Sequence, residues 1–184
     1  MTQLRSSRPW IAVAALLGVF GVSGILQSPA LANSSSAQNW AKQAPQTSPT
    51  ARWAASMAAA GNGVNLVLFG GYGDNNRLFG DTWNWNGSSW TKRAPATSPP
   101  ARWDASMAYD AATRSTVLFG GSGSRVFGDT WTWNGSTWAP QAPAASPRPR
   151  WYGSMAYDAA SGNIVLFGGK RNPSHAFGDT WTWH

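Results

Sequence analysis

Residues 117–138 read VLFGGSGSRVFGDTWTWNGSTW, and they contain the motif that indicates the fold. An apolar run ends at a double glycine, a Phe-Gly-Asp-Thr-Trp segment follows, and two further tryptophans come after it. Residues 67–90 read VLFGGYGDNNRLFGDTWNWNGSSW and residues 165–183 read VLFGGKRNPSHAFGDTWTW, so the pattern occurs three times. Gly70 and Gly120 are 50 residues apart, and Gly120 and Gly168 are 48 apart. Self-similarity at this period predicts an array of like structural units.

Each repeat predicts four short strands. In the first repeat, residues 54–59 are Ala, Ser and Met, and small residues suit the strand nearest the axis of a β-propeller. Residues 64–69 are almost continuously apolar, as in a strand covered on both faces. Residues 81–86 alternate strictly, with Trp83 and Trp85 on one face. The fourth strand is centred on Trp90, after an Asn-Gly hairpin signal whose two residues both tolerate positive φ.

These residues resemble the kelch repeat: the double glycine, the aromatic pair of the third strand and the tryptophan of the fourth. The form Phe-Gly-Asp-Thr-Trp-x-Trp resembles bacterial kelch repeats related to the propeller of galactose oxidase, over residues 39–184. The resemblance implies an all-β fold in which each repeat is one propeller blade of four antiparallel strands. The repeats span roughly residues 50–95, 100–143 and 148–184.

The number of repeats raises the question of how a ring could close. A propeller usually has about four to eight blades, and three repeats are present. The third repeat lacks a fourth strand, while residues 39–45 (NWAKQAP) match residues 89–95 (SWTKRAP) and 137–143 (TWAPQAP) and form a detached fourth strand. Two chains could exchange terminal strands to form a six-bladed homodimer, or the chain could be a fragment of a longer protein. A closed three-bladed monomer is disfavoured by ring geometry, and an open arc would expose two apolar blade faces.

Residues 1–32 predict a signal peptide. Arg5 and Arg8 precede an uncharged apolar run at residues 10–26, and Ala30-Leu31-Ala32 has the small-x-small pattern of a cleavage site. The alternative is an uncleaved anchor, although this glycine-containing run is marginal for spanning about 30 Å of hydrocarbon. We therefore predict a propeller domain at residues 33–184, secreted or extracytoplasmic at a bacterial cell surface or in a periplasm. No stable membrane span would remain after cleavage.

Composition excludes several classes of function. The chain of 184 residues has no cysteine, which excludes disulfides, thiolate metal sites and a cysteine nucleophile. The formal net charge is +7. The sequence nevertheless lacks the basic stripe with interleaved aromatics that would indicate nucleic-acid binding. A modestly basic surface favours acidic glycans, cell-wall polymers or an anionic protein partner. No metal site and no cofactor are predicted.

Residues that recur in every repeat are more often structural than functional. Asp81, Asp129 and Asp179 are predicted to be turn aspartates at the start of the third strand. The arginines that precede the first strand could pair with a turn aspartate or reach the channel mouth. A structural role, bonding blade to blade, is favoured, with a binding role at the channel mouth left open. The tryptophans beside them are core residues by default, yet their flat faces could stack on sugars. The channel-mouth set is Arg52, Arg102, Arg150, Trp53, Trp103 and Trp151.

Function is expected where the repeats differ, namely in the loops between the second and third strands. A polar and basic rim on one face suits anionic or polyhydroxyl ligands, whereas the alternative is a solvated loop with scattered charge. The predicted binding residues of this loop face are Asp74, Asn75, Arg77, Arg125, Lys170, Arg171 and His175.

The sequence favours an extracytoplasmic binding module for a carbohydrate or a protein partner. The alternative is part of a carbohydrate-active kelch enzyme, such as a sugar epimerase, a mutarotase or an oxidase. The copper–radical chemistry implied by the galactose-oxidase resemblance requires a Tyr–Cys crosslink, and the chain has no cysteine. No residue is predicted to be catalytic, because no Ser-His-Asp arrangement, phosphate loop or zinc spacing is present.

Overall fold

The computed structural model describes residues 39–61 and 66–184. The chain divides into residues 1–40 and 41–184, and every described strand lies in the second unit. Within the described ranges all regular elements are β-strands, which confirms the predicted all-β fold. The predicted signal segment at residues 1–32 lies outside the described residues. No helix capable of crossing a membrane occurs among the described residues.

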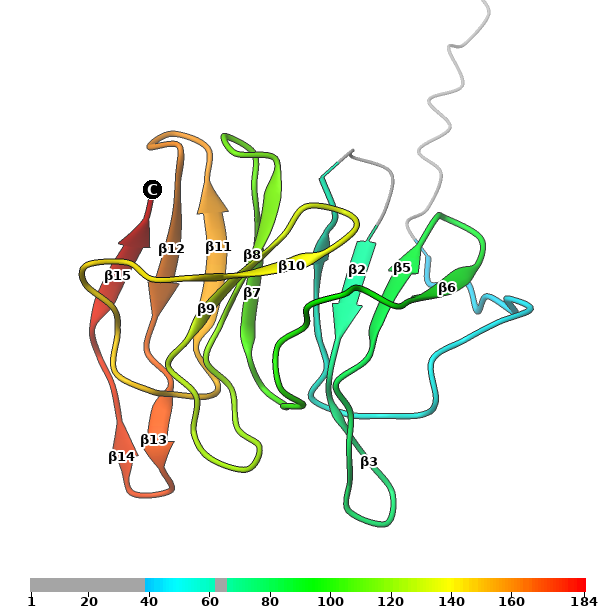
Figure 1. Cartoon of the computed structure of the whole chain (residues 1–184), viewed down its shortest axis with the longest axis horizontal. Coiled ribbons are helices and arrows are strands. Elements are labelled where there is room, and N and C mark those ends of the chain that lie inside the picture. The colour runs from blue at the N-terminus through cyan, green and yellow to red at the C-terminus, as the bar shows by residue number, and fades with distance from the viewer. Residues whose placement is uncertain (1–38, 62–65) are drawn as a thin grey trace, which may run out of the picture. The chain divides into compact units, whose positions relative to one another are not determined.

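Three antiparallel sheets follow one another along residues 41–184 and stand side by side in Figure 1. We call them blades 1, 2 and 3. The four-strand meander predicted from the repeats is confirmed in blades 1 and 2. Blade 1 contains β1 (Ser56–Ala59), β2 (Leu66–Phe69), β5 (Thr82–Trp85) and β6 (Trp90–Arg93). Blade 2 contains β7 (Ser106–Asp110), β8 (Ser115–Phe119), β9 (Thr130–Trp133) and β10 (Trp138–Gln141), and blade 3 contains β11 (Ser154–Asp158), β12 (Asn163–Phe167) and β15 (Thr180–Trp183).

Strand β7 contacts β1 on one side and β11 on the other, so the first strands of the three blades are neighbours. This agrees with the small residues of the first strand, which permit a close approach. The observed first strand of blade 1 is shorter than the predicted range of 54–59, because Ala54 has a φ of 52° and is not extended.

The double glycine joins neighbouring blades. A Cβ placed on Gly120 would lie 2.4 Å from the carbonyl oxygen of Arg150, and one on Gly70 would lie 2.3 Å from that of Arg102. Gly120 also has a φ of 70°, which disfavours any side chain. Gly121 donates its backbone N–H to the same Arg150 carbonyl at 2.8 Å. The glycines are therefore required by contact between blades as well as by a turn.

A hydrophobic cluster fills the contact between blades 1 and 2. Phe69 of blade 1 packs with Met107, Leu118, Trp133 and Trp138 of blade 2. A smaller cluster joins blades 2 and 3 through buried Ala108, Val117 and Ile164. The core of the molecule thus lies between the blades.

The outward faces of blades 1 and 3 are open. Phe69 and Phe119 are 1% and 3% exposed, whereas the equivalent Phe167 on blade 3 is 54% exposed. Met57 on blade 1 is 53% exposed, whereas Met107 is buried. The three blades do not close a ring, and the predicted exposure of two apolar blade faces is confirmed.

Blade 3 has three strands among the described residues, as the repeat pattern predicts. Residues 41–45 belong to no strand in the single chain. The pairing of residues 39–45 as a fourth strand therefore stays a prediction.

Two of the loops predicted between the second and third strands are short hairpins. They consist of β3 (Tyr72–Gly73) with β4 (Arg77–Leu78) and of β13 (Lys170–Asn172) with β14 (His175–Ala176). Asn75 and Asn76 turn the first hairpin with φ of 57° and 60°. Two consecutive positive φ values are typical of a tight hairpin turn, which explains asparagine at both positions.

Candidate functional site

A buried arginine clamps each repeat. The Arg102 guanidinium donates to the two carboxylate oxygens of Asp129 at 2.6 and 2.9 Å and to the Gly120 carbonyl at 2.9 Å. It also lies 3.9 Å from the centroid of the Phe127 ring. The same ion pair joins Arg52 to Asp81 and Arg150 to Asp179, each at 2.5 Å.

This clamp fixes the protonation state of its aspartates. Burial alone would raise the pKa of Asp129, but hydrogen bonds from Arg102 and from the Trp131 indole lower it below the ordinary value. The pKa of Asp179 is lowered chiefly by the hydrogen bond from Arg150. Planar, bidentate pairing of this kind suits arginine and not lysine. The aspartates therefore bind arginine and tryptophan side chains as well as making the backbone bond predicted at the turn, and the Arg–Asp pairing that the sequence allowed is observed.

The arginines are out of reach of a ligand. Arg102 and Arg150 are buried, and the side chain of Arg52 is only 4% exposed. Their guanidinium groups donate to carbonyl and carboxylate groups of the same repeat. Their backbones bond between blades, as where Gly121 N–H donates to the Arg150 carbonyl at 2.8 Å. The sequence predicted that these side chains bond blade to blade, whereas each guanidinium instead holds a single repeat together. The binding role left open for Arg52, Arg102 and Arg150 plays no part in the site described below.

The tryptophans that follow the arginines form an aromatic row. The rings of Trp53 and Trp103 are 5.4 Å apart, and those of Trp103 and Trp151 are 6.4 Å apart. Tyr72 lies 5.2 Å from Trp53, and Tyr152 lies 6.1 Å from Trp103. Trp53 and Tyr152 are both 53% exposed, so the row offers aromatic surface to solvent. We use the name aromatic row for these five residues.

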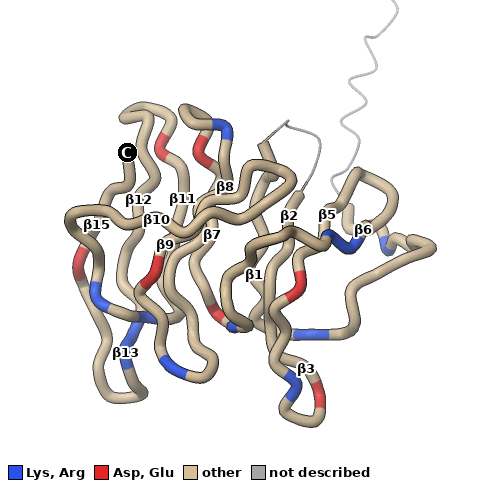
Figure 2. Tube along the Cα trace, viewed as in Figure 1, with Lys and Arg blue, Asp and Glu red and all other residues tan. Residues whose placement is uncertain are grey.

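The aromatic row lies at the same end of the blades as the loop face. Isolated bridges pair Trp53 with Tyr72, Trp103 with Ser122 and Trp151 with Lys170. Each bridge joins the start of a first strand to the start of the loop between the second and third strands. Figure 2 places charged residues along the edge that carries β3 and β13. The two sets of residues predicted from sequence are thus brought together in one region.

The residue after each tryptophan is unusual. Ala54, Asp104 and Tyr152 have φ of 52°, 50° and 59°, a strained region for residues with a side chain. Their backbones connect the blades, because Asp104 N–H donates to the Ala54 carbonyl at 2.9 Å and Tyr152 N–H donates to the Asp104 carbonyl at 3.3 Å. Strain held at one repeated position is typical of a ligand site or of a tight junction.

Asp104 combines burial with a nearby positive charge. Burial raises the pKa of this carboxyl, and Tyr152 and Lys170 lower it only in part. Its Oδ2 atom is buried without a hydrogen-bond partner among the described residues. The charge of Asp104 in turn raises the pKa of Tyr152. A carboxyl, a phenol and an ammonium group therefore lie together beside the aromatic row.

Lys170 links the aromatic row to the loop face. Its Nζ atom lies 4.7 Å from the Tyr152 ring centroid and 5.9 Å from that of Trp151. The other loop-face residues are exposed but less closely grouped. Arg77 lies 4.8 Å from the Phe79 ring and Arg125 lies 5.3 Å from the Phe127 ring. The remaining exposed members are Asp74, Asn75, Arg171 and His175.

Asp104 and Tyr152 were missed by the sequence interpretation. The available signal was the position itself, because Ala54, Asp104 and Tyr152 differ between repeats that are otherwise nearly identical. Within the described residues no cluster of His, Cys, Asp or Glu could hold a metal ion.

Four-stranded blades joined by double glycines, and clamped by a repeated Arg–Asp pair, define a kelch-type β-propeller. The chain belongs to the KLHDC2/KLHL20/DRC7 Kelch-repeats domain family, which matches residues 30–184. Kelch-repeat domains are propellers that bind proteins or other ligands. No curated protein matches the sequence.

A solved structure, described as "Structure of YjhT", has the same fold. It is 16% identical to this chain, with a TM-score of 0.61. The match covers 78% of this chain and 45% of that protein, so this chain corresponds to less than half of the length of its structural neighbour. Similarity at this identity shows the fold alone.

Proposed function

We propose that this kelch domain is an extracytoplasmic binding module that holds an anionic carbohydrate against the aromatic row. The observation that carries the proposal is the grouping of exposed Trp53 and Tyr152 with Lys170 at the loop face. Flat aromatic faces pack against the apolar faces of sugar rings, and their polar tips remain available for hydrogen bonds. The Lys170 ammonium adds attraction for a carboxylate or sulfate group on the ligand.

The loop face would complete the site. Arg77, Arg125 and Arg171 are exposed and would supply attraction around the rim, while Asp74, Asn75 and His175 would supply polar contacts. Charged groups at a rim steer association and confer salt dependence more than they confer affinity. Binding is therefore expected to weaken as ionic strength rises.

The test is binding of the purified protein to an array of neutral and acidic glycans. Trp53→Ala is expected to lower the affinity for every recognised glycan at least tenfold. Lys170→Ala is expected to lower the affinity for acidic glycans more than the affinity for neutral ones. Lys92→Ala is the matched charge control, because Lys92 is exposed on the outer strand β6. Loss of binding in the control, or no effect of Trp53→Ala and Lys170→Ala, would argue against this site. A partner protein bound at the same face, with no glycan recognised, would replace the carbohydrate proposal.

A second candidate is a carbohydrate-active enzyme. Proximity of the half-buried Asp104 carboxyl to the Tyr152 hydroxyl is the observation that favours it. A carboxyl with a raised pKa beside a phenol can exchange protons with a bound sugar. Turnover of any bound glycan, abolished by Asp104→Asn with binding retained, would support the enzyme. Binding without turnover by the unaltered protein would support the binding module.

A further inference from the structure

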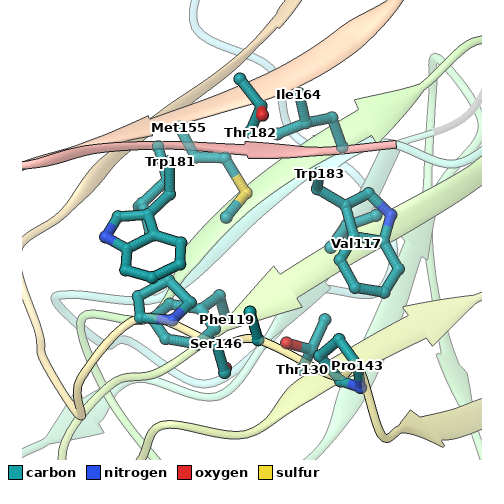
Figure 3. A pocket seen from close by; sticks show the side chains of 13 residues that line it. Val117, Phe119, Thr130, Pro143, Ser146, Met155, Ile164, Trp181, Thr182 and Trp183 are labelled. Carbon is teal, nitrogen blue, oxygen red and sulfur yellow. The ribbon is translucent and has the colours of Figure 1, made fainter.

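The contact between blades 2 and 3 contains an apolar hollow. It is partly open to solvent, and Trp181 and Trp183 project into it from one side of β15. Phe119, Thr130 and Pro143 lie opposite these two rings (Figure 3). A hollow of this kind inside a repeated interface indicates that a side chain is missing from it.

The equivalent place between blades 1 and 2 identifies the missing side chain. There Trp138 of β10 lies 5.4 Å from Phe69 and 5.2 Å from Trp133, ring to ring. Its indole N–H donates to Thr82 Oγ1 at 3.0 Å. The residues equivalent to Phe69, Thr82 and Trp133 in the next interface are Phe119, Thr130 and Trp183, and all three line the hollow. The hollow is therefore a socket for a fourth-strand tryptophan, and we call it the indole socket.

The outer edge of blade 3 has a free position for the strand that carries this tryptophan. In blade 2, β10 pairs with β9 so that Trp138 lies opposite Trp133, Ala139 opposite Thr132 and Gln141 opposite Thr130. The corresponding edge of β15 is unpaired among the described residues, because β15 pairs only with β12. A row of unpaired backbone N–H and C=O groups is a template for another strand.

We propose that Trp40 of a second copy of this chain fills the indole socket, with residues 39–45 of that copy as the fourth strand of blade 3. These residues repeat the motif of residues 137–143, with tryptophan at the same place. The register of blade 2 then places Trp40 opposite Trp183, Ala41 opposite Thr182 and Gln43 opposite Thr180. In blade 2, Gln141 Nε2 donates to Thr132 Oγ1 at 2.9 Å, and Gln43 would donate to Thr182 in the same way.

The linker after residue 42 already lies where this arrangement requires it. Gln43 and Pro45 line a shallow pocket with Met57, Trp85 and Trp90 on the open face of blade 1. In the chain itself, Pro143 and its neighbours lie in the same way beside Met155 and Trp183 of blade 3. The connection from a fourth strand to the next blade would thus be the same between copies as within a copy.

The open blade faces favour a second copy as the occupant. Phe167, exposed on the open face of blade 3, is equivalent to Phe69 and Phe119, which are buried in the covered interfaces. Met57, exposed on the open face of blade 1, is equivalent to Met107, which is buried on blade 2. Joining these faces twice, head to tail, buries all four and gives six blades, within the range of about four to eight that closes a ring. The interface is heterologous and closed.

Cysteine crosslinking tests the arrangement, because the chain has no cysteine of its own. Ala41→Cys with Thr182→Cys places two cysteines directly opposite each other, within the distance that a disulfide spans. We expect a covalent dimer on oxidation of the full-length protein. Lys42→Cys with Thr182→Cys is the control, because a shift of one residue puts the two side chains on opposite faces of the sheet. A crosslinked monomer, equal crosslinking by the control, or no crosslinking in the first pair would overturn the proposal.

Native mass of the unmodified protein gives the second readout. The unaltered chain is expected to be a dimer, and Trp40→Ala is expected to raise the dimer dissociation constant by at least about 30-fold, as loss of a buried aromatic anchor does. Lys42→Ala is the matched control, since the equivalent Pro140 is exposed on β10. Trp40→Ala leaves the fold of the single chain unaffected in circular dichroism if the proposal is right. A monomeric unaltered protein, or a Trp40→Ala dimer of normal strength, would rule out this occupant.

Discussion

The contact between blades 1 and 2 and the contact between blades 2 and 3 are built from nearly the same residues, yet one is filled and the other is hollow. In the first, Trp138 closes the core and its indole N–H is bonded to Thr82. In the second, the equivalent Thr130 faces the indole socket. A single blade is therefore not a self-sufficient folding unit. Its core is completed by the fourth strand, and the position of that strand in the chain decides which contacts are stable.

Removal of the indole from the filled contact should have the largest effect. Trp138→Ala is expected to lower the free energy of unfolding by roughly 3–5 kcal/mol, because a buried aromatic is replaced by a cavity. Trp90→Ala is the control, since Trp90 has the same place in blade 1 but is only half-buried. Its loss should cost less than half as much in urea unfolding of the dilute protein. Equal losses in the free energy of unfolding for the two variants would show that burial of Trp138 between blades 1 and 2 adds no stability.

The glycines test the same comparison through the backbone. Gly120→Ala and Gly168→Ala share a strained φ, of 70° and 68°, but only Gly120 faces a neighbouring blade. A Cβ on Gly168 would meet nothing nearer than the Phe177 carbonyl oxygen at 3.4 Å. Both should lose about 1–2 kcal/mol from the left-handed conformation, and Gly120→Ala should lose about 1–3 kcal/mol more from the clash. Thermal unfolding of the two variants, at a dilution at which the chain is monomeric, measures the contribution of the neighbouring blade.

The Arg–Asp clamps should respond to pH. The folded-state pKa of Asp129 is lowered, so its contribution to stability is present above the unfolded pKa of about 3.9 and is lost as pH falls through the folded pKa. Asp129→Asn should therefore destabilise the protein at pH 7, by roughly 1–2 kcal/mol, and make little difference near pH 2. Urea unfolding across this pH range checks the sign.

The smallest expected effect concerns one hydroxyl. Ser106 Oγ donates to the Gly153 carbonyl of the next blade at 2.7 Å, whereas the equivalent Ser154 is exposed on the open face of blade 3. Ser106→Ala should cost about 0.5–1.5 kcal/mol and Ser154→Ala close to nothing in the single chain. If Ser154→Ala instead weakens the dimer, its hydroxyl makes the same bond across copies.

Much of the fold could be predicted from sequence because each blade contains the same local motifs. The double glycine, the alternating Trp83 and Trp85, and the Asn-Gly turn act locally, so their spacing was sufficient to place the strands. The turn itself differed in detail. Only Gly87 has a positive φ, while the Asn86 side chain accepts hydrogen bonds from the backbone N–H groups of Ser88 and Ser89.

The candidate site was less accessible to sequence reasoning. The aromatic row depends on three residues about 50 positions apart coming together at one end of neighbouring blades, and the tryptophans were identified because they recur. Asp104 and Tyr152 do not recur, and their strained φ has no sequence signature outside glycine and asparagine. The short hairpin at residues 170–176 likewise depends on tertiary pairing that its composition does not indicate.

The paired tryptophans of the outer strands are also chromophores. Trp133 and Trp138 lie 5.2 Å apart at 43°, and Trp85 and Trp90 lie 5.3 Å apart at 46°. Two indoles at this distance and angle couple their excited states. Blades 1 and 2 therefore each contain an exciton pair, which absorbs left and right circularly polarised light unequally. Trp183 has no such companion among the described residues of its own chain. Arrival of Trp40 at blade 3 would add a third pair, and assembly would then register as an optical change without any label.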